Sequence, residues 1–452
     1  MAKADRDAVL RARKRVSPPG GALLEDTEKM KQKHHRMLCA FCALVILVST
    51  VFPTAAFAEQ PVDAAAAEQT LTRADAAEMQ QADAAVTALT ESEQYQEMDT
   101  DTRKDAALAQ LDTLAAKGLV EKDSIYTDEE NGMVSFRYPC GVLGGILLTE
   151  PEDETLDEEN AETETTSNAL PLRLPPDLGA EMQKSRAALL RRTENQAVEK
   201  FGTAVIYYAF DNTINSSRFP YYAYMQGFWS ALGLETKINI HVTVADLKKM
   251  GNFNVSVLSA HGSYYTYSYG KFLKRTRTEP IMLLTEESTF GKDLRYGFDL
   301  LAHRVIKVNG MYCVTSDFFR NAYKGGKLSN TIVYSETCEF LGVDGSEDNA
   351  MADALLSGGA QAVIGYVNNV YTVYSRSMLW DTINHLIMGQ NVGQALEHAK
   401  ATYGEDDLIW YHAQGGRRPH AAASYAVLYG NSQAALHVPE SNRSMFSADL
   451  AA

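Results

Sequence analysis

Short apolar runs alternate with helical patterns along the second half of this 452-residue chain. An apolar run of about four to eight residues between turn residues is typical of a strand that is buried on both faces. We expect six main strands, at 202–210, 237–244, 254–259, 331–335, 360–365 and 425–430. Helices are expected between them, at 221–232, 349–356, 375–388 and 392–403. This alternation predicts an α/β fold with a doubly wound, mostly parallel six-stranded sheet and helices on both of its faces.

The region before this domain divides into segments of contrasting composition. Residues 59–149 begin rich in Ala and Glu, which favours helix, and end in short alternating runs. We interpret them as a helical N-terminal extension, a pro-region or spacer with short strands. Residues 150–176 form an acidic, proline-containing linker, and 177–200 a helical lead-in. The main domain then spans 201–438, and 439–452 is a C-terminal tail.

An insertion at 264–330 interrupts the pattern of the main domain. Its first part, at 264–277, is rich in Tyr, Lys and Arg and predicts a basic, aromatic loop. A strand at 304–308 and a helix at 317–323 are expected further on.

The first 58 residues have the pattern of a leader and a secretory signal peptide. Basic residues precede an apolar run at 37–52, and the small-residue sequence Ala-Phe-Ala at 56–58 provides a cleavage site. The apolar run is short for a membrane span, so we expect no stable span after cleavage and a secreted, cell-surface or periplasmic protein. An uncleaved membrane anchor is the alternative. Either Met1 or Met30 could be the start.

Charge and cysteine content narrow the classes of partner. The net charge of −16 argues against a nucleic-acid partner, which requires clustered Lys and Arg.

Three cysteines follow the signal peptide, namely Cys140, Cys313 and Cys338. That number is too small for a disulfide framework, although Cys140 and Cys313 could pair and leave Cys338 free.

Two of the expected strands end in residues that suit a thiol nucleophile. The strand at 331–335 leads into Glu336 and Cys338, and the strand at 254–259 leads into His261 and Gly262. Ligands of open α/β sheets bind beyond the carboxyl ends of the parallel strands. We therefore expect Cys338 and His261 to meet at that edge, as a cysteine nucleophile and its histidine do.

The region 201–432 resembles the caspase-like fold of the clan CD cysteine peptidases, and most of all the clostripain and gingipain group. Three motifs carry the resemblance: an apolar strand ending in His-Gly at 255–262, an apolar strand ending in acid-x-Cys at 332–338, and a helix, glycine turn and strand at 351–365. The final strand at 426–430 also fits. The caspase sequence Gln-Ala-Cys-x-Gly is replaced here by Glu-Thr-Cys-Glu-Phe.

The resemblance implies a cysteine endopeptidase with a dyad of Cys338 and His261. The backbone N–H groups of Gly262 and Cys338 are the expected oxyanion hole, since glycine lets the backbone come close. Glu336 matches the position that lines the primary specificity pocket, and on a strand it would share the face of Cys338. A carboxylate there implies cleavage of polypeptide substrates after Arg or Lys. Legumain-like proteins also carry Glu at this position and prefer Asn.

Basic pairs provide candidate sites of self-processing. Cleavage after Arg191 and Arg192 would release residues 59–192, and Lys274 with Arg275 and Arg277 is a second candidate.

Other readings of the sequence stay open. The main alternative is a catalytically silent caspase-like module that binds partners at a surface, and a third possibility is an unrelated flavodoxin-like domain. No cofactor is required, and the ten histidines show no zinc-ligand spacing, so we expect no metal in the site. The acidic loop at 344–349 could hold calcium, with a solvated turn as the alternative.

Overall fold

A computed structural model describes residues 70–148, 184, 198–210, 219–270, 274–408 and 423–446, all within one compact unit. The predicted leader and signal peptide, the acidic linker and the Arg191–Arg192 pair lie outside the described residues. None of the helices in the described residues combines the length and the apolar character that a membrane crossing requires.

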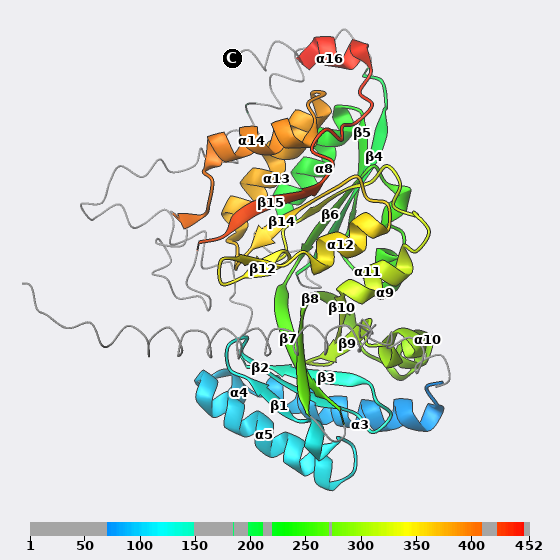
Figure 1. Cartoon of the computed structure of the whole chain (residues 1–452), viewed down its shortest axis with the longest axis vertical. Helices are drawn as coiled ribbons and strands as arrows, with labels where there is room; N and C mark the ends of the chain where they lie inside the picture. The colour runs from blue at the N-terminus through cyan, green and yellow to red at the C-terminus, as the bar shows by residue number, and fades with distance from the viewer. Residues whose placement is uncertain are drawn as a thin grey trace, which may run out of the picture. The chain divides into compact units, whose positions relative to one another are not determined.

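A six-stranded sheet forms the centre of the fold, in the order β15-β14-β11-β6-β4-β5 (Figure 1). Its strands are β4 (Gly202–Ala209), β5 (Leu234–Asn239), β6 (Val255–Ala260), β11 (Ile332–Ser335), β14 (Ala362–Val367) and β15 (Tyr425–Gly430). All neighbours are parallel except β15, which runs antiparallel to β14. The predicted α/β class with a largely parallel sheet is confirmed. One strand is displaced, because β5 ends at Asn239 and Val244 already begins a helix.

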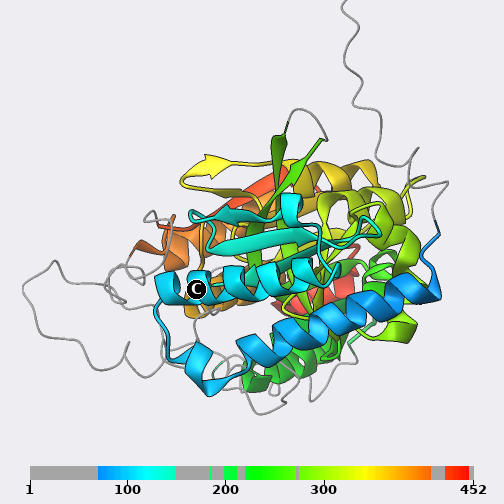
Figure 2. The same ribbon diagram turned by 90° about the horizontal axis from the view of Figure 1, so that it is seen from below.

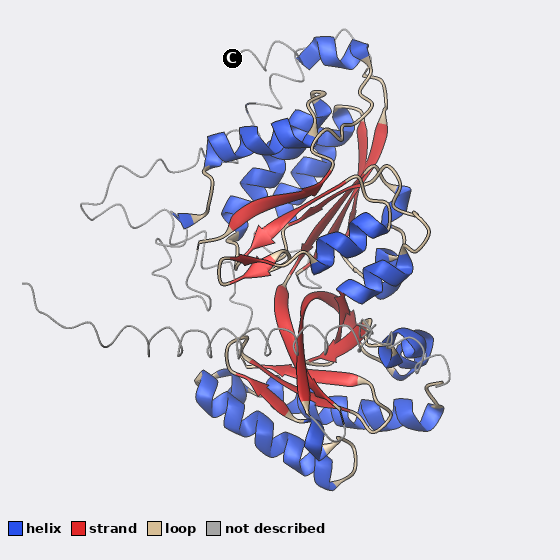
Figure 3. Cartoon of the chain, viewed as in Figure 1, coloured by secondary structure: helices blue, strands red, loops and turns tan. Residues whose placement is uncertain are grey.

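Helices cover both faces of this sheet (Figure 3). One face packs against α8 (Phe219–Ala231), α13 (Thr372–Ile387) and α14 (Val392–Tyr403), and the other against α9 (Val244–Leu247), α11 (Ser316–Ala322) and α12 (Ala350–Ser357). Successive side chains of β4 divide between the two apolar layers, since Ile206 packs in the first and Val205 and Tyr207 in the second. Burial on both faces explains why these strands are continuous apolar runs.

A second sheet, of seven strands, has the order β1-β2-β3-β9-β10-β8-β7. Its strands are β1 (Tyr126–Asp128), β2 (Met133–Arg137), β3 (Leu143–Leu147), β7 (Gly262–Tyr269), β8 (Arg275–Glu287), β9 (Val305–Val308) and β10 (Met311–Thr315). The prediction of a loop at 264–277 is wrong, because β7 and β8 pair antiparallel there. Tyr265 and Tyr267 are buried in one apolar cluster, with the two-residue period of a strand.

The N-terminal segment and the insertion build this second sheet together. β3 pairs parallel with β9 of the insertion. Helices α3 (Arg73–Thr90), α4 (Glu93–Gln96), α5 (Thr100–Ala116) and α10 (Phe290–Leu301) accompany the sheet, and Figure 2 shows α3 and α5 side by side. At the junction the buried Lys307 ammonium contacts Asp83 of α3 at 2.5 Å and Asp293 of α10 at 2.9 Å. Cleavage of the linker would therefore leave residues 70–148 held by a strand ladder and a buried ion pair.

Candidate active site

His261 lies where the chain passes from one sheet to the other. β6 ends at Ala260 and β7 begins at Gly262, so His261 alone connects them. Its carbonyl oxygen accepts a hydrogen bond from the N–H of Leu283 at 2.9 Å. Its ring packs edge-on against Phe210, with the ring centroids 5.0 Å apart. The imidazole is thus held at the carboxyl end of a central strand.

Cys338 follows the neighbouring strand β11, which ends at Ser335. Ser335 pairs with Leu258 of β6, so the carboxyl ends of β11 and β6 lie next to each other. The half-buried Cys338 sulfur accepts a hydrogen bond from the N–H of Val370 at 3.4 Å and lies 3.6 Å from the Val370 carbonyl oxygen. An N–H donor of this kind stabilises negative charge on sulfur.

The His-Gly end and the cysteine end touch through Gly262. A Cβ atom on Gly262 would lie 2.1 Å from the carbonyl oxygen of Cys338 and 2.4 Å from Cγ2 of Thr337. Both are closer than any van der Waals contact allows, so this approach requires glycine. The structure therefore places Gly262, the residue after His261, directly against the Thr337–Cys338 backbone, from which the sequence separates it.

The N–H of Gly262 is oriented away from β8. In an antiparallel ladder, hydrogen-bonded residue pairs alternate with pairs that share no hydrogen bond. His261 and Leu283 are hydrogen-bonded, so the next pair, Gly262 and Met282, shares no hydrogen bond. β7 is the end strand of the described sheet, so this N–H is not taken up by the ladder of that sheet. An oxyanion-hole donor needs such an orientation.

Glu336 is a buried carboxylate. The expectation that Glu336 shares a strand face with Cys338 does not hold, because β11 ends at Ser335, before both residues. The Glu336 carboxylate accepts hydrogen bonds from the hydroxyl of Tyr222 at 3.0 Å and from that of Ser375 at 3.4 Å. Burial raises the pKa of Glu336 to about 7, while Tyr222 and the positive charge of Arg376 act in the opposite direction.

The chain turns sharply just after the nucleophile candidate. Glu339 and Asn368 both adopt left-handed backbone conformations, with φ of 54° and 67°, and the N–H of Glu339 donates to the Asn368 carbonyl at 2.9 Å. Left-handed residues other than glycine are uncommon and cluster at functional sites. Nothing in the sequence around Glu339 signals this turn.

Cys140 and Cys313 differ from Cys338 in their environment. The pairing that the sequence allowed does not form, since both are free thiols. Burial raises the pKa of Cys140 to about 11 and raises that of the Cys313 thiol further. The thiolate is the reactive form of cysteine, so both are poor nucleophiles at neutral pH. Among the cysteines that the structure describes, Cys338 is the candidate.

The acidic loop at 344–349 belongs to a small hairpin of β12 (Gly342–Val343) and β13 (Ser346–Glu347). Asp344 and Gly345 form its two-residue turn, with φ of 52° and 71°. The carboxylate of Asp348 accepts hydrogen bonds from the hydroxyl of Tyr264 at 3.0 Å and from a backbone N–H at 2.9 Å. Asp344 and Gly345 thus form the turn of the hairpin, whereas Asp348 lies beyond β13.

Three residues around Glu336 were not found from the sequence. Tyr222, Ser375 and Arg376 come from α8 and α13, and only the packing of these helices on the sheet brings them to the carboxylate.

No model of a known protein family and no curated protein sequence matches the chain. The function therefore has to be argued from the residues and their geometry.

Proposed function

We propose that the protein is a cysteine endopeptidase of caspase-like fold, with Cys338 as its nucleophile and His261 as its proton-transfer partner. The observation that carries the proposal is the approach of Gly262 to the Cys338 carbonyl, within 2.1 Å of a Cβ position. That approach joins the two strand ends expected from the sequence at one edge of a parallel sheet, where ligands bind in this class of fold.

The arrangement supports acyl transfer to sulfur. His261 accepts the Cys338 proton as Sγ bonds to the carbonyl carbon of the scissile peptide. The carbonyl oxygen then carries negative charge, which the N–H groups of Gly262 and Cys338 stabilise. His261 returns the proton to the leaving amine, and water hydrolyses the thioester to regenerate the thiol.

We propose Glu336 as the determinant of cleavage after Arg or Lys. It precedes the nucleophile by two residues, and the residue is 3% exposed. A charge pair formed with a buried carboxylate is stronger than one in water. Arg376 already places a positive charge near this carboxylate, so a basic substrate side chain has to compete with Arg376.

Hydrolysis of short amide substrates tests both parts of the proposal. The panel contains substrates ending in Arg, Lys or Asn, and the proteins are the parent, Cys338→Ala, His261→Ala and Glu336→Gln. We expect cleavage after Arg or Lys, complete loss in the first two variants, and loss of the basic preference in the third. Cleavage after Asn alone would overturn the role of Glu336 but keep the dyad. No cleavage by the parent, even after the linker is cut, would favour the silent binding module.

The proposed location outside the cytoplasm rests on the signal-peptide pattern in the first 58 residues. N-terminal sequencing of secreted protein, beside a Cys338→Ala variant, tests signal cleavage and self-processing together. Identical termini in the two proteins would exclude self-processing.

A further inference from the structure

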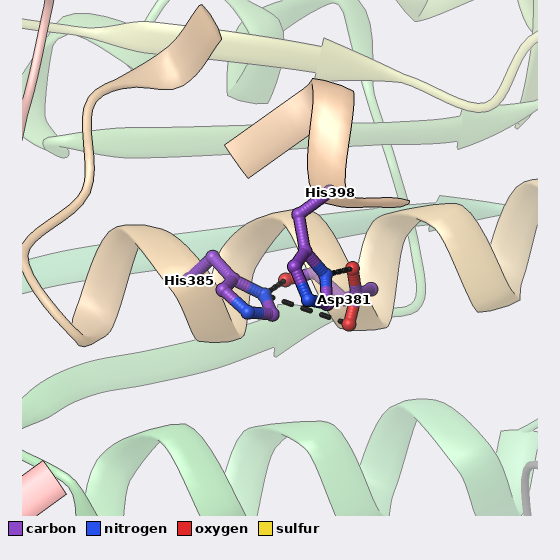
Figure 4. Close-up of side chains that lie close together, drawn as sticks. All are labelled: Asp381, His385 and His398. Carbon is purple, nitrogen blue, oxygen red and sulfur yellow. Dashed lines mark hydrogen bonds and ion pairs between the residues drawn. The ribbon is translucent and has the colours of Figure 1, made fainter. Parts of the chain in front are cut away.

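Two histidines and an aspartate meet between α13 and α14 (Figure 4). Asp381 and His385 lie four residues apart on α13 and so share one helix face. His398 reaches them from α14. The Asp381 carboxylate contacts Nδ1 of His398 at 2.7 Å and Nδ1 of His385 at 3.5 Å, and the two imidazole rings lie with their centroids 3.7 Å apart.

The cluster is shielded on one side and open on the other. The side chains of Asp381 and His385 are 13% and 9% exposed, whereas that of His398 is 48% exposed. The His385 ring is also hydrogen-bonded to its own helix, since its Nδ1 lies 2.9 Å from the backbone carbonyl oxygen of Asp381. A carbonyl oxygen only accepts, so Nδ1 carries the hydrogen and Nε2 is left as the nitrogen for a further ligand.

We propose that Asp381, His385 and His398 bind a divalent transition-metal ion of the zinc type. One ligand atom from each of these residues lies within 4.8 Å of the other two. The ligands of a tetrahedral zinc ion lie about 3.3 Å apart, since each bond is about 2.0–2.1 Å long. Side-chain rotation alone can close that difference.

The donor set selects the class of ion. Two imidazoles and one carboxylate suit zinc and its neighbours in the first transition row. Calcium instead takes about six to eight oxygen ligands, which this cluster does not provide. The exposed side of His398 leaves room for water as the fourth ligand.

Such an ion would tie α13 to α14. Asp381 lies six residues beyond Ser375, which contacts Glu336, so the two positions are about 9 Å apart along the helix axis. The cluster therefore lies away from the contact between Ser375 and Glu336, although one helix carries residues of both. Its expected effect is to stabilise the helix pair.

The test measures zinc binding by the full chain carrying Cys338→Ala, which removes the thiolate as a competing ligand. Zinc content after equilibrium dialysis gives the stoichiometry, and competition with a chromophoric chelator gives the affinity. Cobalt(II) substitution provides a visible spectrum that reports tetrahedral coordination. We expect one zinc per chain and a rise in Tm of about 5 °C at a hundredfold excess over Kd.

The partly exposed His398 permits a clean variant, and the exposed His241 provides a matched control. His398→Ala should bind zinc at least about 100-fold more weakly, because a direct ligand contributes more than the outer-shell partners whose loss costs ~10–100-fold. His241→Ala should bind as the parent does. If His398→Ala fails to fold, as judged by its melting curve in chelator, Asp381→Asn replaces it. Binding by the variant within about tenfold of the parent, or no bound zinc in the parent, would overturn the proposal.

Discussion

Replacing Gly262 with alanine should separate the two halves of the proposed site. The new Cβ would lie 2.1 Å from the Cys338 carbonyl oxygen and 2.4 Å from Thr337, whereas ordinary contact begins at 3.4 Å. The first contact is with backbone, so no side-chain rotation can relieve it. The nucleophile loop has to retreat by about 1 Å, a displacement that can cost on the order of 100-fold in rate. Overpacking of this kind also destabilises the fold by about 1–3 kcal/mol.

Two measurements report how Gly262→Ala changes the site. The first is kcat/KM on the best amide substrate, which should fall at least about 100-fold, because the displaced N–H of Gly262 also ceases to serve the oxyanion. The second is the rate of alkylation of Cys338, which reports the sulfur environment without a substrate.

Gly291→Ala is the matched control for this substitution. Gly291 is exposed in α10, and a Cβ there meets no atom within 4 Å. We expect parent activity and stability from Gly291→Ala. A Gly262→Ala protein with the kcat/KM of the parent would refute the argument that this close approach builds the site.

Three further predictions concern the buried charges and the N-terminal segment. Lys307→Met should destabilise the fold by about 3–5 kcal/mol in urea unfolding at pH 7, because it leaves two buried aspartates without their cation; an unchanged midpoint would contradict this. Burial raises the pKa of Glu279 from 4.5 to about 7, so the stability that its protonated form contributes is present below pH 4.5 and is lost as the pH rises through 7. Glu279→Gln should remove that loss, about 3 kcal/mol between the two limits, and parallel pH profiles for variant and parent would refute it. Limited proteolysis of the 150–176 linker should leave residues 70–148 bound to the rest of the chain in size-exclusion chromatography, and separation without denaturant would show that β3–β9 pairing does not hold them.

The central sheet could be predicted because its strands are buried on both faces. β4 was expected at 202–210 and spans Gly202–Ala209, and β14 was expected at 360–365 and spans Ala362–Val367. Continuous apolar runs of this kind are local signals, which a single sequence displays. The positions of Cys338 and His261 at the carboxyl ends of their strands follow from the same signals.

Strand β9 was expected at 304–308, and short strands were expected before residue 149. The strands β7 and β8 and the pairing of the whole second sheet could not be predicted, for two physical reasons. β7 carries Ser and Thr between its tyrosines and so shows no continuous apolar run. β8 has an apolar run only at 281–284, after a first half that begins with the exposed Arg275. In addition, β3 pairs with β9 across a long stretch of chain, and such pairing leaves no local pattern. Strand character in these segments depends on contacts made only in the fold.

The contacts around the candidate residues could not be predicted from the sequence for a similar reason. Tyr222 and Ser375 reach Glu336 because of how α8 and α13 are rotated on the sheet. The four-residue spacing of Asp381 and His385 is visible in the sequence, but only the packing of α14 on α13 brings His398 to them. In both clusters, the packing of helices brings together side chains that are far apart in the sequence.

Selective chemical modification distinguishes a nucleophilic Cys338 from an ordinary thiol. Brief treatment of the native protein with iodoacetamide at pH 7, followed by peptide mass spectrometry, compares Cys338 with Cys140 and Cys313 in the same sample. We expect rapid labelling of Cys338, slower labelling in His261→Ala, and almost none at the half-buried Cys140 and the buried Cys313, whose pKa values burial raises. Labelling of Cys338 no faster than that of Cys140 would contradict its assignment as the nucleophile.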